Sequence, residues 1–119
     1  MPLVEGQALG SGPNNASGVL VRGIRQQDLP HVPGIFNNVR LGTLANFNDS
    51  GGVAIGTRLA SDLGLTLGQS ITIVSPRGSV TPFGTAPRVK AYPIVAIFEI
   101  GMAEYDSTFV IMPFAEAQS

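Results

Sequence analysis

The 119-residue chain contains no cysteine, which excludes a disulfide framework and any thiolate metal site. Histidine is almost as scarce: His31 is the one imidazole, so no two-histidine metal centre can form within the chain. Its Leu-Pro-His-Val-Pro setting predicts a loop residue instead of a ligand. We therefore expect neither a metal site nor another cofactor.

Charge is also scarce and balanced. The chain has seven Lys and Arg residues and eight Asp and Glu residues, so its net charge is close to zero. No strong positive electrostatic field is available to hold a nucleic acid through many phosphate contacts. Long apolar runs are missing too. The longest, residues 94–98, is far short of the roughly 20 residues of a membrane-spanning helix, and the first residues lack the pattern of a signal peptide. We expect the chain as given to be soluble.

Catalytic motifs are missing as well. The sequence has no Gly-x-Ser-x-Gly nucleophile motif and no glycine-rich phosphate-binding motif. Glu99, Glu104 and Asp106 gather near one turn and could act as paired carboxylates or as ligands of a hard cation. Because their spacing lacks the alternation of a calcium-binding loop, a solvated acidic turn is the favoured interpretation. The sequence predicts that the protein is not an enzyme; an enzyme would need an ordered cluster around His31 and these acids.

What the sequence does contain is a set of short β-branched segments divided by glycine and proline. Residues 58–63 have the pattern of a helix, with Thr57 as its N-cap and Gly64 as a left-handed residue at its end. We expect a flexible hairpin connection at residues 10–18, an irregular segment at 25–49 and a polar turn at 102–107. Strands are expected at residues 19–24, 52–56, 70–74, 89–100 and 108–112, with Pro93 at an edge or a bulge.

This order of elements predicts an α+β fold that is mainly β. We expect a small mixed or partly barrel-like sheet with one short helix and a protruding proline-rich hairpin loop, all in a single domain over residues 1–119. The last six residues have the pattern of a helix that begins where the chain stops. We therefore expect the chain to be a fragment of a larger protein.

The proline-rich loop, residues 75–88, is the strongest candidate for a binding element. It places Val80 and Phe83 among prolines that reduce the entropy lost on binding. Arg77, Arg88 and Lys90 flank these two apolar residues, while no acid occurs between residues 62 and 99. The alternative, which the residues alone leave open, is that Val80 and Phe83 fold back onto the core.

Several segments in order resemble a known family. They are Ser-Gly-Val-Leu-Val-Arg-Gly-Ile at 17–24, Ile-Gly-Thr-Arg-Leu-Ala at 55–60 through Leu-Gly-Leu at 63–65, the strand at 71–74, Val-Ala-Ile-Phe at 95–98, Tyr-Asp-Ser at 105–107 and Met-Pro-Phe at 112–114. The chain resembles the extracytoplasmic domain of ABC-transporter permeases of the lipoprotein-releasing LolC/LolE type, within a wider MacB-like group. The resemblance covers most of the chain.

This resemblance implies a docking function. In the LolC-like members a hairpin called the hook captures the periplasmic carrier LolA, and Thr-Pro-Phe-Gly at 81–84 is similar to the Thr-Pro-x-Gly pattern of that hook. The turn at 102–107 is instead closer to LolE-like or undivided permeases, which implies a system with one permease type. The implied partner-binding residues are Arg77, Val80, Thr81, Pro82, Phe83, Gly84, Pro87 and Arg88.

The resemblance also implies a location and further partners. The domain would lie on the periplasmic side of the bacterial inner membrane, as part of a permease that moves lipoprotein cargo. A LolD-like ATPase and a second permease copy would bind parts of the permease outside this chain. The alternative is a MacB-like assembly or mechanotransmission module that contacts a periplasmic adaptor or a second permease copy. A broad apolar sheet face would favour that alternative, whereas a single exposed loop patch would favour the carrier.

Overall fold

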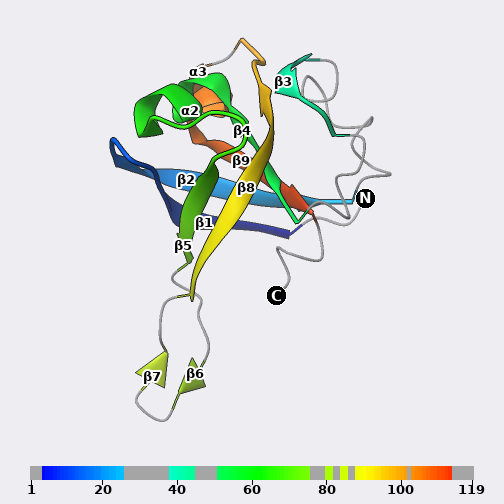
Figure 1. Ribbon diagram of the computed structural model, residues 1–119. Coiled ribbons are helices and arrows are strands. Elements are labelled where there is room, and N and C mark those ends of the chain that lie inside the picture. Colours follow the sequence, from blue (N-terminus) through cyan, green and yellow to red (C-terminus); the bar gives the residue numbers. More distant parts are fainter. Residues whose placement is uncertain are drawn as a thin grey trace.

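The computed structural model describes residues 4–25, 38–44, 51–75, 80–81, 84–85, 88–101 and 103–113. Figure 1 shows a sheet curled into a barrel, with two short helices over one end. The strands are β1 Val4–Ser11, β2 Ala16–Ile24, β3 Val39–Gly42, β4 Val53–Gly56, β5 Ser70–Ser75, β6 Val80–Thr81, β7 Gly84–Thr85, β8 Arg88–Phe98 and β9 Phe109–Pro113, and the helices are α2 Thr57–Leu63 and α3 Ala103–Thr108.

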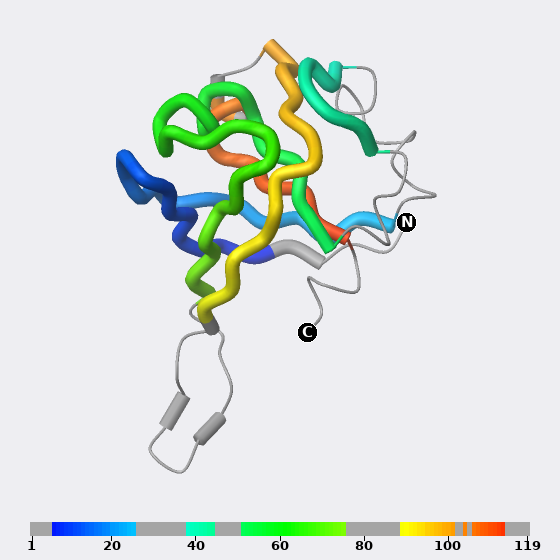
Figure 2. The backbone as a smooth tube through the Cα atoms, viewed as in Figure 1, coloured from blue at the N-terminus to red at the C-terminus, as the bar shows by residue number. Residues whose placement is uncertain are grey.

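The barrel closes through β8. Its strands follow the order β8-β4-β9-β2-β1-β5, and β5 pairs again with β8. β2 runs parallel to β9 and β4 runs parallel to β8, whereas the other neighbours are antiparallel. β8 can serve three neighbours because its first half pairs with β5 and its second half lies between β4 and β3. Figure 2 shows β5 and β8 as neighbouring lengths of the chain.

The strands bury residues on both faces. Along β9, Val110 and Met112 belong to one apolar cluster, whereas Phe109 and Ile111 belong to a second. Successive side chains of a strand point to opposite faces, so these clusters lie on the two sides of the sheet. The first cluster receives side chains from all the barrel strands and from α2, and it therefore fills the barrel interior.

A β-bulge in β8 keeps this two-sided burial in phase. Ile94 pairs with Val53, but the next pair joins Ala96 to Ala54, so Val95 is an extra residue. Consequently Ile94 and Ile97 both contribute to the interior cluster, although they are three residues apart. The bulge lies two residues after Pro93, in the region where the sequence indicated an irregularity.

Helix α2 closes one end of the barrel. Leu59 and Leu63 are four residues apart, so they share one face of the helix and both are fully buried in the interior cluster. Gly64 ends the helix in the left-handed conformation, with φ of 74°, as the sequence predicts. The N-cap is Gly56, which makes no side-chain capping bond, so the prediction of Thr57 as the cap is wrong.

The fold class is confirmed: the structure is mainly β, with a barrel-like sheet and short helices. One further local prediction is wrong: the described residues of the predicted turn at 102–107 belong to helix α3. The predicted hairpin connection at 10–18 does join two antiparallel strands, but it is shorter than predicted, because β1 continues to Ser11 and β2 begins at Ala16. Pairing across the β1–β2 hairpin holds residues that are weak strand formers by themselves.

Candidate functional site

The candidate site is the hairpin that joins β5 to β8. The two strands pair up to Ser75 and Arg88, and this last pair closes the base of residues 76–87. Within the loop, β6 and β7 pair with each other through Val80 with Thr85 and Thr81 with Gly84. They form a sheet separate from the barrel, which Figure 1 shows beyond the ends of β5 and β8.

The structure places the predicted binding residues unequally. The backbone of Val80, Thr81 and Gly84 lies in the β6–β7 sheet, and that of Arg88 begins β8. Because Thr81 pairs with Gly84, Pro82 and Phe83 connect the two short strands in the sequence. Arg77, Pro82, Phe83 and Pro87 lie outside the described residues, as does His31.

An exposed apolar row lies beside the base of this hairpin. Leu9 pairs with Val74, and Val74 pairs with Val89, so the three side chains share the outer face of β1, β5 and β8. Leu9 is 43% exposed and Val89 is 62% exposed. This row was not predicted from the sequence, although the sequence contains a pattern that indicates part of it. Ile71 and Ile73 point into the barrel, so the alternation along β5 places Val74 on the outer face.

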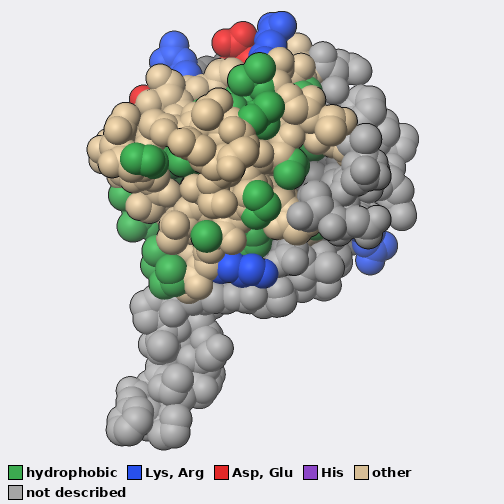
Figure 3. Space-filling view, in the orientation of Figure 1, with side chains coloured by type: hydrophobic (Ala, Val, Ile, Leu, Met, Phe, Trp, Pro, Cys, Tyr) green, Lys and Arg blue, Asp and Glu red, His purple; other side chains and the backbone are tan. Residues whose placement is uncertain are grey.

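A basic side chain also lies near the hairpin base. The ammonium group of Lys90 stands 5.1 Å from the ring centroid of Tyr92, a cation–π distance, and Lys90 is itself exposed. Figure 3 shows few charged side chains over the described part of this face, with apolar groups spread between them. The hairpin base is therefore apolar with isolated positive charge.

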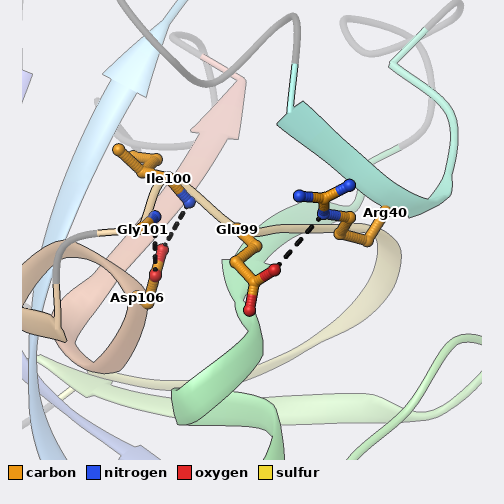
Figure 4. Close-up of polar contacts among 5 residues, drawn as sticks. All are labelled: Arg40, Glu99, Ile100, Gly101 and Asp106. Carbon is orange, nitrogen blue, oxygen red and sulfur yellow. Dashed lines mark hydrogen bonds and ion pairs between the residues drawn. The ribbon is translucent and has the colours of Figure 1, made fainter.

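The acidic residues near α3 have structural contacts. Asp106 is buried, at 4% exposure, and its carboxylate oxygens accept hydrogen bonds from the backbone N–H groups of Ile100 at 2.7 Å and Gly101 at 3.0 Å. Glu99 lies 3.4 Å from Nε of Arg40 in an exposed ion pair (Figure 4). For Asp106 the prediction of a solvated turn is wrong, because this carboxylate ties the end of β8 to α3.

Beyond these contacts, the described residues form no cluster that could hold a metal ion. No three His, Cys, Asp or Glu side chains among them lie close enough to share a metal ion. A shallow depression over β1 and β2 is lined, among the described residues, by Gln7, Ala8, Gly18, Val19, Leu20 and Thr108. None of these side chains is ionisable, so they offer no acid or base. Among the residues that the structure describes, no helix has the length and apolar character needed to cross a membrane.

The described structure is thus a small closed barrel that carries a separate two-stranded hairpin. The chain is similar to the lipoprotein-releasing system transmembrane protein LolC of Neisseria meningitidis serogroup B, at 28% identity over 98% of the chain. It is also similar to LolC of two Xylella fastidiosa strains, Temecula1 and 9a5c, at 25% identity over the same share of the chain. The predicted resemblance to lipoprotein-releasing permeases of the LolC/LolE type is confirmed.

The matched region is a part of each relative. The chain spans 28% of the length of each LolC protein. No protein-family model matches the chain. The wider MacB-like grouping therefore stays a prediction from the sequence.

Proposed function

We propose that the chain is a non-catalytic, extracytoplasmic docking domain of a lipoprotein-releasing ABC-transporter permease, and that residues 76–87 bind a LolA-like periplasmic carrier. The observation that carries this proposal is the separation of the β6–β7 sheet from the barrel. A hairpin that pairs with no barrel strand among the described residues adds nothing to barrel closure. The hairpin can therefore serve to bind a partner.

The proline pattern supports a preorganised binding element. Pro76, Pro82 and Pro87 lack backbone N–H groups, so none of them can donate a hydrogen bond to a neighbouring strand. Among the described residues of the loop, β6 and β7 are the paired segments. A hairpin restricted in this way loses less conformational entropy when it binds. Pro82 and Phe83, which connect the two strands in the sequence, are the apolar contacts in this proposal, and Gly84 and Pro87 shape the loop.

The base of the hairpin extends the proposed surface. Among the described residues the exposed large apolar side chains are Leu9, Leu41 and Val89. Leu9 and Val89 belong to the row beside the hairpin, whereas Leu41 lies on β3. This distribution favours a local docking patch over the broad apolar face that a MacB-like assembly module would need. Arg77 and Arg88 act in the proposal as rim charges that steer the carrier.

In this account the domain transfers no energy by itself. Energy for release comes from a LolD-like ATPase that acts through other parts of the permease, and the lipoprotein cargo passes to the carrier on the periplasmic side of the inner membrane. A second permease copy completes the transporter.

The experiment is a calorimetric titration of this chain with the LolA-like carrier from the same organism. We expect Phe83→Ala and Pro82→Gly each to weaken binding by about 1 to 3 kcal/mol, the usual range for an interface anchor, with unchanged circular dichroism. Leu41→Ala is the matched control, because it removes an exposed apolar side chain that lies away from the hairpin. Wild-type affinity in both hairpin variants would overturn the proposal.

A further inference from the structure

Among the described residues, the outer edge of β1 is open next to the hairpin over residues 4–8. β2 pairs with all of β1, from Val4 to Ser11, but β5 pairs only with Leu9 to Ser11. Among the described residues no strand pairs with residues 4–8 on the side opposite β2. Alternate backbone N–H and C=O groups of this stretch therefore point away from the barrel sheet with no strand to receive them.

The place where β5 leaves β1 adjoins the base of the hairpin. Leu9 pairs with Val74, and the next residue of β5, Ser75, pairs with Arg88 at the hairpin base. The open edge begins at Ala8, directly beside Leu9. A strand added to this edge would lie beside the hairpin and the apolar row in which Leu9 and Val89 are exposed and Val74 is half-buried.

The residues of the edge suit recognition through the main chain. Gly6 and Gln7 are exposed, and a Cβ added to Gly6 would meet no atom within 4 Å. Gly6 has no side chain and Gln7 is polar, so at these two positions the edge offers backbone groups and no apolar side chain to an approaching segment. Such an edge fits an extended segment of another protein, which binds by strand addition.

We propose that an extended segment of the carrier adds as a strand to the open edge of β1 while the hairpin is engaged. This inference rests on the proposed function, since the hairpin delivers the carrier to the edge. The hairpin then supplies the side-chain contacts and β1 supplies backbone hydrogen bonds, which are insensitive to the sequence of the added segment.

Amide hydrogen exchange, followed by NMR on the isotope-labelled chain with and without a saturating amount of the LolA-like carrier, tests this proposal. We expect alternate amides among residues 5–8 to exchange at least about tenfold more slowly when the carrier is bound. The control is the outer edge of β3, residues 39–42, which among the described residues pairs only with β8 and lies away from the hairpin. Its amides should keep their rates.

The outcomes separate this inference from the proposed function. Hairpin-dependent binding without slower exchange at residues 5–8 would overturn strand addition and leave the docking function standing. Equal slowing at β1 and β3 would also overturn it, because that result means general stabilisation. If the amides of residues 5–8 exchange slowly without the carrier, and more slowly as the concentration of the chain is raised, a second copy of the chain occupies the edge. That result would reject the carrier as its occupant. An absence of any binding would instead contradict the proposed function.

Discussion

Replacing Asp106 with alanine should lower the stability of the fold and leave the hairpin at residues 76–87 unchanged. The buried carboxylate accepts hydrogen bonds from the N–H groups of Ile100 and Gly101, and it holds the end of β8 against α3. A hydrogen bond to a charged group contributes about 1.5 to 3 kcal/mol. Because Gly101 is exposed and water can reach its freed N–H group, we take the lower end and expect a loss of about 3 kcal/mol for the two bonds.

The assay is urea unfolding followed by circular dichroism. With a slope of about 1.5 kcal/mol per molar, a loss of about 3 kcal/mol lowers the unfolding midpoint by about 2 M. Glu104→Ala is the matched control: it removes an exposed acid from the same helix and should change stability by less than about 0.5 kcal/mol. If Asp106→Ala unfolds at the wild-type midpoint, the carboxylate does not hold this junction and the structural reasoning is wrong.

Further substitutions test the packing of the barrel end by the same unfolding assay. Gly56→Ala should cost more than about 2 kcal/mol, since the added Cβ would overlap the carbonyl group of Asp106, whereas Gly18→Ala meets no atom within 4 Å and should cost less than about 1 kcal/mol. Equal stability of these two variants would contradict the close approach of α3. Leu63→Ala should cost about 2 to 5 kcal/mol, because the side chain is fully buried in the barrel interior; a cost below about 1 kcal/mol would contradict that burial.

The sequence predicted those elements whose signals are local. The alternation around Ile71 and Ile73 indicated β5. Gly64 indicated the end of α2, because the left-handed backbone conformation at a helix end favours glycine. Closure of the barrel was not predictable in detail, since it depends on β1 pairing with β5 and β2 pairing with β9, which are distant in the sequence. The bulge at Val95 is equally non-local: it exists because β4 and β8 must stay in phase.

Helix α3 and Asp106 show where local reasoning failed. The segment that contains Glu104 and Asp106 is polar, and the spacing of its acids lacks the alternation of a calcium-binding loop, which indicated a solvated turn. The structure instead packs α3 against α2 and buries Asp106, whose carboxylate is compensated by two backbone donors that no sequence pattern reveals. At the hairpin, the prolines predicted a separate ribbon. The apolar row beside it could not be predicted, because it depends on the pairing of Leu9 with Val74.

Docking of a LolA-like carrier by residues 76–87 can be tested by replacing the tip of the loop. The carrier is titrated into the wild-type chain and into a variant whose residues 80–85 are replaced by glycine and serine. We expect measurable binding to the wild type and its loss in the variant, with the barrel still folded. Equal binding to both chains, or no binding to either, would contradict the claim.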